Sequence, residues 1–227
     1  VTDFADAVET VRKGTGGRLS VAAISTAKYF APRMIVAFKE LHPGLELRFL
    51  IGNRAETMAL LRDYDVDIAL TGRPAANLPV ERIAIGPHPY VMIAPPFHRF
   101  VGRTAIPKSD LAGETFLFRE EGSGSRTLFD YYIGDIPVRL AQIGIELGSN
   151  ETIKQAVMAG LGIALISAHT VAVEVADGRL ACLDVAGLPI IRQWYLAYRP
   201  ERELSSVALA FRDFVRDRGA EFLPKLP

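Results

Sequence analysis

The sequence predicts an α/β protein with two similar lobes, and three observations support this. The chain has 227 residues, enough for one large domain or two lobes of about 100 residues each. Strand-like apolar stretches are followed repeatedly by stretches with helical spacing, which is typical of parallel sheets with right-handed crossovers. This rhythm breaks at Gly86-Pro87-His88-Pro89 and then resumes, so the architecture repeats although the sequence does not.

The first set of elements precedes this break. Apolar residues alternate in two segments, run together in a third, and recur every three or four positions in the segments between them. The expected strands are 19–23, 45–51 and 66–71, and the expected helices are 30–41 and about 53–62. Ser25 and Thr26 follow the first strand and are expected to cap the helix after it.

The second set follows the break and ends in a helix with a clear apolar stripe. The expected strands are 90–94, 115–118, 143–147, 163–167, 180–185 and 190–198, and the expected helices are 125–133, 150–159 and 204–215. Gly160 and Gly162 bracket the exit of the helix at 150–159, which is a C-cap signal.

The N-terminal segment stands apart from both sets. Residues 1–13 carry apolar side chains at helical spacing, and a lone helix of this length is marginal in water. We therefore interpret residues 1–16 as the end of a longer linker or dimerisation helix. Because Val1 opens in what reads as mid-helix, we expect the chain to be a fragment.

Composition and charge exclude several classes of protein. The formal net charge is +0, so these residues alone are not expected to bind DNA, which usually requires a basic excess. No stretch approaches the roughly 18 apolar residues of a membrane span, and none reads as a signal peptide, so we expect a cytoplasmic protein without a membrane partner. The single cysteine, Cys182, excludes an internal disulfide, and its apolar neighbours predict a buried structural thiol.

Small hydroxyl residues and arginines recur after the predicted strands, at the edge where open parallel sheets bind ligands. The segments are Ser25-Thr26, Gly52-Asn53-Arg54, Gly72-Arg73, Arg119 to Arg126, Ser149-Asn150-Glu151 and Ser167-Ala168-His169. Hydroxyl groups, helix N-termini and arginines all suit carboxylate or phosphate groups. We infer an anionic small-molecule site in a cleft between the lobes. Each Ser or Thr alone could instead be a helix N-cap, and each arginine a surface charge.

The segment REEGSGSR, residues 119–126, is a Gly/Ser-rich turn between a strand and a helix, which is a natural anion cradle. It lacks the Gly-Lys-Ser/Thr ending of a phosphate-binding P-loop. Glu120 and Glu121 beside it are expected to be solvated. His42 and His88 precede prolines and are expected to serve turns, whereas His169 could face the cleft or take a cap or surface role.

No reactive constellation accompanies these polar groups. The histidines show no metal-ligand spacing, and no nucleophile comes with a base and an orienting third group. We therefore expect neither a metal nor a cofactor, and binding without turnover is the simpler interpretation.

The whole chain resembles the linker-helix end and effector-binding region of LysR-type transcriptional regulators, and within them the RuBisCO-operon activators of the Calvin cycle. Several motifs are specific only in combination: Gly-Asn-Arg, Gly-Arg-Pro, Arg-Glu-x-Gly-Ser-Gly-Ser/Thr-Arg and Gly-Ser-Asn-Glu-x-Ile-Lys-Gln. The segments that carry the resemblance are STAKYFAPRMIVAF (25–38), IGNRAETMALL (51–61), DIALTGRP (67–74), HPYVMIAPPFHRF (88–100), FLFREEGSGSRTLF (116–129), GSNETIKQAVMAGLGIALIS (148–167), GRLACLDVAGLPIIRQWYLAYR (178–199) and LSSVALAFRDFV (204–215).

The resemblance implies two Rossmann-like α/β lobes joined by two crossover strands, as in type 2 periplasmic binding proteins. Lobe I would hold residues 17–87 and 194–227, lobe II residues 88–193, and the crossovers would lie near 86–90 and 190–196. The N-terminal winged helix-turn-helix domain of the family is absent here, so promoter DNA would be bound only through that missing part. This fragment would form a homodimer, and the full-length protein a homotetramer.

The resemblance also implies an effector between the lobes. In this subgroup it would be a phosphorylated metabolite such as ribulose 1,5-bisphosphate or phosphoglycolate, sometimes with NADPH. Its binding would shift the lobe arrangement or the dimer geometry and so change how the protein bends DNA. The expected contacting residues are Ser25, Thr26, Asn53, Arg54, Arg73, Arg119, Ser123, Ser125, Arg126 and Asn150.

Two other functions are compatible with a bilobal α/β fold. A solute-binding protein of a transporter would have the same fold and a ligand in the same place, but the linker-like N-terminal helix argues against it. An enzyme such as a transferase would need a reactive group at the cleft, and Cys182 is poorly placed for that role.

Overall fold

A computed structural model describes residues 16–74, 78–134 and 144–225 of the chain. The chain divides into two compact units. The first comprises residues 1–87 and 193–223, and the second comprises residues 88–192 and 224–227. Two strands are shared between them: β4 (Glu81–Ala94) and β9 (Ile190–Tyr198) each begin in one unit and end in the other. This mixed α/β arrangement with two crossover strands confirms the predicted fold class.

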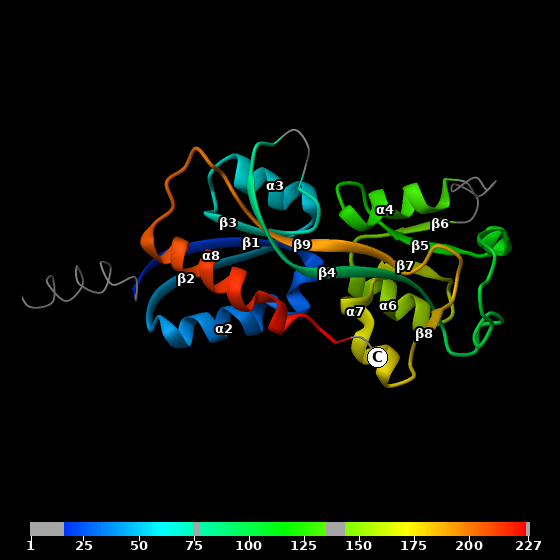
Figure 1. The fold of residues 1–227 in the computed structure, drawn as a ribbon. Coiled ribbons are helices and arrows are strands. Elements are labelled where there is room, and N and C mark those ends of the chain that lie inside the picture. The colour runs from blue at the N-terminus through cyan, green and yellow to red at the C-terminus, as the bar shows by residue number, and fades with distance from the viewer. Residues whose placement is uncertain (1–15, 75–77, 135–143, 226–227) are drawn as a thin grey trace, which may run out of the picture. The chain divides into compact units, whose positions relative to one another are not determined.

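The first unit is an open sheet with helices on both faces (Figure 1). Besides parts of β4 and β9, its elements are β1 (Gly16–Ile24), η1 (Ser25–Tyr29), α2 (Ala31–Leu41), β2 (Gly44–Gly52), α3 (Arg54–Arg62), β3 (Ile68–Thr71), α8 (Ser206–Arg218) and η3 (Gly219–Phe222). β1 lies between β2 and β3 and is parallel to both, and β3 pairs antiparallel with β9. Ile24 is opposite Gly52 and Ala23 is opposite Leu70, so the three parallel strands end at one edge.

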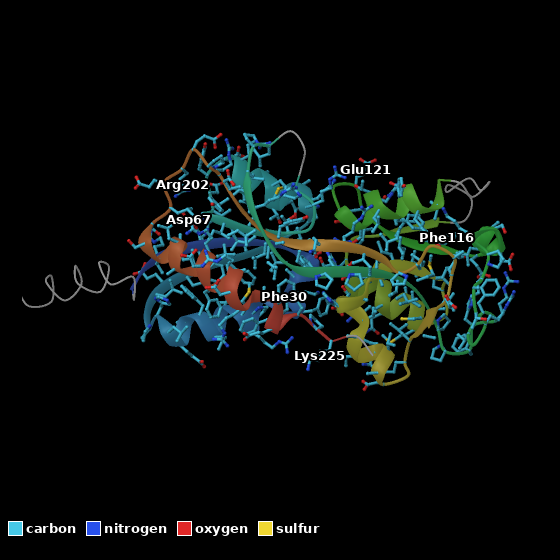
Figure 2. The ribbon with its side chains drawn as sticks, viewed as in Figure 1. Phe30, Asp67, Phe116, Glu121, Arg202 and Lys225 are labelled. Carbon is cyan, nitrogen blue, oxygen red and sulfur yellow. The ribbon has the colours of Figure 1, made fainter. Side chains whose placement is uncertain are left out.

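Apolar side chains fill both sides of this sheet. Leu19 and Val21 of β1 belong to the cluster that includes α2 and α8, whereas Ala22 belongs to the cluster that includes α3. Figure 1 shows α3 on one face of the sheet and α2 and α8 on the other. Phe30, labelled in Figure 2, packs edge to face on Trp194 with ring centroids 4.9 Å apart. Residues from both ends of the chain therefore build this core.

Asp67 links two strands and a loop of this unit through hydrogen bonds and an ion pair. Asp67 accepts hydrogen bonds from the Ser20 backbone N–H (2.8 Å) and hydroxyl (2.7 Å), and its other oxygen lies 3.1 Å from the Arg202 guanidinium. Figure 2 labels Asp67 and Arg202 near one another in the first unit. These contacts connect the start of β3 to β1 and to the loop between β9 and α8.

The second unit has the same layered construction. Besides parts of β4 and β9, its elements are η2 (Lys108–Gly113), β5 (Phe116–Arg119), α4 (Gly124–Ile133), β6 (Gly144–Leu147), α6 (Asn150–Met158), β7 (Ala164–Ser167), α7 (Ala168–Ala176) and β8 (Ala181–Leu183). β5 and β6 are parallel, and a parallel bridge between Phe116 and Ile163 brings the start of β7 beside β5. β7 and β8 both pair antiparallel with β4.

Alternation along β5 divides the core of the second unit into two clusters. Phe116 and Phe118 pack with Phe129 of α4, whereas Leu117 belongs to the cluster that includes Ile153 of α6 and residues of α7. Figure 1 shows α4 on one face and α6 and α7 on the other. By the same period of two, Arg119 at the end of β5 falls on the α6 side.

Two expectations about elements were wrong, and one helix was not expected. Ser25 and Thr26 lie inside the 3-10 helix η1, and the residue that caps α2 is Phe30. The chain does not leave the strand at Pro87 and Pro89, because β4 runs through both. The helix α7 was not predicted, and it follows β7 directly.

Two expectations about single residues were also wrong. Cys182 is exposed, because β8 pairs with β4 and alternates its side chains between buried and exposed faces. An apolar run in such a strand is therefore not buried on both sides. His88 serves no turn: it is 1% exposed inside β4 and lies 2.9 Å from the Ser167 hydroxyl.

Candidate functional site

The predicted contacting residues fall into two groups, one at the carboxyl edge of each unit's parallel strands. Ser25, Thr26, Asn53, Arg54 and Arg73 follow β1, β2 and β3 in the first unit. Arg119, Ser123, Ser125, Arg126 and Asn150 follow β5 and β6 in the second. Each group is brought together because parallel strands end at one edge, and helices begin there.

In the first unit, Thr26 and Asn53 illustrate opposite situations. Thr26 is 3% exposed, and its hydroxyl has no hydrogen-bond partner among the described residues. Asn53 caps α3: its Oδ1 accepts from the Glu56 N–H at 3.0 Å, and Glu56 accepts from the Asn53 N–H at 2.8 Å. Asn53 and Glu56 thus form a capping box, a role that was not expected for Asn53. Arg54 opens α3, and Arg73 is exposed after β3.

Arg119 is the cation at the centre of the second group. Its side chain is only 4% exposed, and it ends β5 opposite Leu147 of β6. Its Nε and Nη2 donate to the two carboxylate oxygens of Glu120 at 2.7 and 2.8 Å, and its Nη1 donates to Asn150 Oδ1 at 2.9 Å. Glu120 is therefore bound to a buried arginine and is not solvated as expected, whereas Glu121 is exposed.

Arg126 lies on the opposite side of β5. Its guanidinium sits 4.4 Å from the centre of the Phe118 ring and donates to Asp130 at 2.9 Å and Glu146 at 2.8 Å. Burial lowers its pKa, but the hydrogen bonds that Arg126 donates to Asp130 and Glu146, together with their negative charges, outweigh burial and leave the pKa raised. Arg126 thus joins α4 to β6 and to the Arg119 carbonyl oxygen, which lies 3.2 Å away.

The N-termini of α4 and α6 complete the second group. Ser123 occupies the N-cap position of α4 without a capping hydrogen bond among the described residues, and both Ser123 and Ser125 are buried. Asn150 begins α6, while the cap of that helix is Ser149, which accepts from the Thr152 N–H at 3.0 Å. The first-turn N–H groups of each helix point toward this edge, where they favour negative charge.

A buried histidine pair at the same edge was missed by sequence reasoning. His88 and His169 lie with ring centroids 6.0 Å apart and nearly parallel planes, and His169 is 4% exposed in the first turn of α7. Burial, and then the charge of His169, hold the pKa of His88 well below its ordinary value, and burial lowers the pKa of His169 to about 4. The one signal in the sequence was the position of His169 directly after a predicted strand.

Among the described residues, no three His, Cys, Asp or Glu side chains form a group that could hold a metal ion. Within the same residues, no helix combines the length and the apolar character that a membrane crossing requires.

Known proteins similar to this chain are regulators of transcription. The transcriptional regulator CbbR of Rhizobium meliloti strain 1021 is 47% identical over 219 residues, covering 96% of this chain and 70% of the relative. The RuBisCO operon transcriptional regulator of Allochromatium vinosum is 40% identical over 218 residues, covering 96% and 72%. The chain therefore spans about seven tenths of these relatives, and their names support the expectation that it is not an enzyme.

The fold leads to the same group of proteins. The regulatory domain of Synechocystis CcmR, solved in complex with 2-PG, superimposes with a TM-score of 0.82 at 34% identity, covering 88% of this chain and 96% of that one. The family described as LysR substrate binding domain matches residues 12–220. With the family matched over nearly the whole chain, this protein belongs to the LysR substrate-binding domains.

Proposed function

We propose that this chain is the effector-sensing region of a transcription regulator and that it binds a small anionic, phosphorylated metabolite. The regulated genes are those of carbon fixation, including RuBisCO. Support comes from the names of its relatives and from the 2-PG bound to the CcmR regulatory domain. Ribulose 1,5-bisphosphate and phosphoglycolate are the primary candidates, and NADPH is a further one.

The observation that carries the proposal is the placement of Arg119. A guanidinium that is 4% exposed and bonded to the first residue of α6 is expensive to desolvate unless it meets negative charge. Glu120 supplies that charge in this structure, at a position that an anionic ligand could take in its place. Asn150 and the buried Ser123 and Ser125 surround the same edge with groups that can hydrogen-bond phosphate oxygens. The ten predicted residues remain the proposed contacting set. Its buried members are Thr26 in the first unit and Arg119, Ser123, Ser125 and Asn150 in the second.

Regulation follows if the effector binds two arrangements of the protein with different affinity. Its binding would then shift the population toward one of them and change the position of the DNA-binding parts of the whole protein. We propose a homodimer for this chain, a homotetramer with a helix-turn-helix domain for the whole protein, and a cytoplasmic location. Promoter DNA would be contacted through that domain alone.

A thermal-shift screen tests the ligand class. The panel holds ribulose 1,5-bisphosphate, phosphoglycolate, other sugar phosphates, NADPH, simple carboxylates and amino acids. A ligand at 100 times its dissociation constant stabilises the folded chain by about 2.7 kcal/mol, which is easily visible. Stabilisation by phosphorylated compounds alone supports the proposal. Stabilisation by amino acids or carboxylates alone would overturn the ligand class while leaving the family intact.

Substitutions then test the site. Arg119→Met should weaken phosphoglycolate binding about tenfold or more, measured by calorimetry, because it removes a charge-assisted contact. The matched control is Arg179→Met in the same unit, where Arg179 makes a half-exposed ion pair with Asp177. Arg126→Ala tests the second arginine, and an unchanged affinity would remove Arg126 from the contacting set.

A further inference from the structure

Glu120 occupies the same face of Arg119 that an anionic ligand would use. The Nε and Nη2 edge of a guanidinium is a fork that donates two parallel hydrogen bonds to a carboxylate or phosphate. In this structure the fork holds the Glu120 carboxylate, at 2.7 and 2.8 Å. The other end of the guanidinium donates to Asn150, which keeps the fork oriented.

Glu120 is suited to leave this position, whereas Arg119 is not. Arg119 lies in β5 with its side chain 4% exposed, but the Glu120 side chain is 25% exposed and follows the strand in the turn before α4. The Glu120 carbonyl accepts from the Ser123 N–H at 3.3 Å, which holds the backbone of the turn independently of the carboxylate. The turn can therefore keep its shape when the carboxylate leaves Arg119.

We propose that Glu120 is a built-in competitor of the effector, which holds the Arg119 fork until the effector's anionic group replaces it. This inference rests on the proposed function, because it assumes that Arg119 receives the effector. Removal of one partner of a buried ion pair is strongly destabilising, so the chain needs a counter-charge on Arg119 when no effector is bound. Glu120 supplies that charge and thereby weakens every anion that competes for the fork.

The competition also determines which anions bind. A ligand carboxylate that replaces the Glu120 carboxylate forms an equivalent ion pair with Arg119, so the exchange contributes little binding free energy. A phosphate with a charge near −2 and three acceptor oxygens interacts more strongly with the same fork. Phosphorylated ligands would therefore displace the Glu120 carboxylate from Arg119, whereas simple carboxylates would not.

Calorimetry on the whole chain with 2-phosphoglycolate and with glycolate, its counterpart without phosphate, tests this. Glu120→Gln should bind 2-phosphoglycolate about tenfold more tightly than the unaltered chain and should bind glycolate measurably. Glu120→Asp keeps the charge and should stay close to the unaltered chain. The control is Glu121→Gln, which removes the same charge from the neighbouring exposed position at the rim of the second unit (Figure 2).

The outcomes separate this inference from the proposed function. If the unaltered chain binds 2-phosphoglycolate but Glu120→Gln binds it equally or less well, Glu120 is no competitor, and weaker binding would mean that it positions Arg119 for the ligand. If Glu121→Gln tightens binding as much as Glu120→Gln, the effect is general charge and the inference fails. If neither the unaltered chain nor Glu120→Gln binds 2-phosphoglycolate or inorganic phosphate, the proposed function fails and the competitor with it.

Discussion

Buried threonine hydroxyls mark the carboxyl edge of the first unit. Among the described residues, the hydroxyls of Thr26 and Thr71 are buried and have no hydrogen-bond partner, and both residues lie where β1 and β3 end. Leaving such a group unsatisfied costs about 1–3 kcal/mol. A ligand that hydrogen-bonds these hydroxyls would recover this energy, so their burial is consistent with a polar ligand at this edge.

Thr26→Val separates binding from stability. Valine has nearly the same shape, so the free energy of unfolding should stay within about 0.5 kcal/mol or rise, because no hydrogen bond is lost. Phosphoglycolate affinity should fall about fivefold if Thr26 contacts the ligand. Thr57→Val is the matched control, since the Thr57 hydroxyl is equally buried and without a partner in the described structure but lies inside α3. Equal affinities of the two variants would exclude Thr26 from the contacting set.

The histidine pair predicts a pH dependence of stability. In the folded chain the pKa of His169 is about 4, below the ordinary value of 6.5. Between pH 4 and 6.5 the unfolded chain therefore binds more protons than the folded chain. The contribution of His169 to the free energy of unfolding is present above pH 6.5 and is lost as the pH falls toward 4. Urea unfolding of His169→Gln should show a shallower loss of stability over this range. Carboxylates titrate in both proteins, so only the difference between the two curves reports on His169. Parallel curves would contradict the lowered pKa of His169.

Single-residue environments were the least predictable from the sequence. Glu120 and Glu121 are neighbours of the same type, yet one pairs with a buried arginine and the other is exposed. Their difference depends on where β5 ends and on the position of Asn150, which is distant in sequence. The ten contacting residues could be nominated because each follows a strand, but local pattern does not show which groups are buried or paired.

At the scale of elements, Lys154 connects the two helices behind the second unit's site. Its ammonium lies 2.8 Å from Glu174 of α7 and 3.2 Å from Glu151 of α6, and the side chains of Lys154 and Glu174 are 4% and 12% exposed. α6 begins with Asn150 and α7 carries His169 in its first turn. The pair thereby fixes the helices that present two groups at this edge.

Lys154→Met should lower the free energy of unfolding by about 3 kcal/mol, because Glu174 would keep a buried charge without its partner. The double variant Lys154→Met/Glu174→Gln should recover much of this loss in urea unfolding. Glu151→Gln is the control: Glu151 is 45% exposed and should cost less than about 1 kcal/mol. A double variant less stable than Lys154→Met would contradict the argument.

Gly162 has a different role from the predicted one. Gly160 ends α6 with φ at +86°, as a C-cap glycine does, but a Cβ at Gly162 would overlap the Thr115 carbonyl oxygen. That oxygen accepts from the Ile163 N–H at 2.9 Å, where β7 joins β5. Gly162→Ala should therefore cost about 2 kcal/mol of stability in urea unfolding. Gly113→Ala, which meets open space, should change it by less than about 0.5 kcal/mol, and equal effects would refute the close approach.

Most elements could be predicted because their apolar pattern agrees with their burial. The limits of β9 were predicted correctly at 190–198, and α3 ends at Arg62 as expected. α7 was missed because Val171, Val173 and Val175 favour strands, and only packing makes this segment helical. β4 tolerates Pro87 and Pro89 because residues two apart in a strand direct their backbone N–H groups to the same side. The two prolines therefore remove hydrogen-bond donors from one side of β4 only.

At the scale of the molecule, the second unit is an insertion into the first. Its described core clusters use residues between Tyr90 and Ile190, whereas the first unit's main core combines β1 with Trp194, Leu196 and Phe211. We therefore expect residues 88–192 to fold when expressed alone, with a cooperative urea transition followed by circular dichroism. Residues 1–87 alone should not, because they lack β9 and α8. A folded 1–87 piece or an unfolded 88–192 piece would contradict this division.

The dependence of the first core on β9 and α8 has a consequence for synthesis. The chain leaves the ribosome from its N-terminus at about 5–20 residues per second, so the second unit is complete before Trp194 and Phe211 emerge. During that interval β1, β2 and α2 expose apolar faces that no later segment has yet covered. Translation pauses before α8, or a shortage of chaperones, should therefore harm the yield of this protein more than similar stress applied within the second unit.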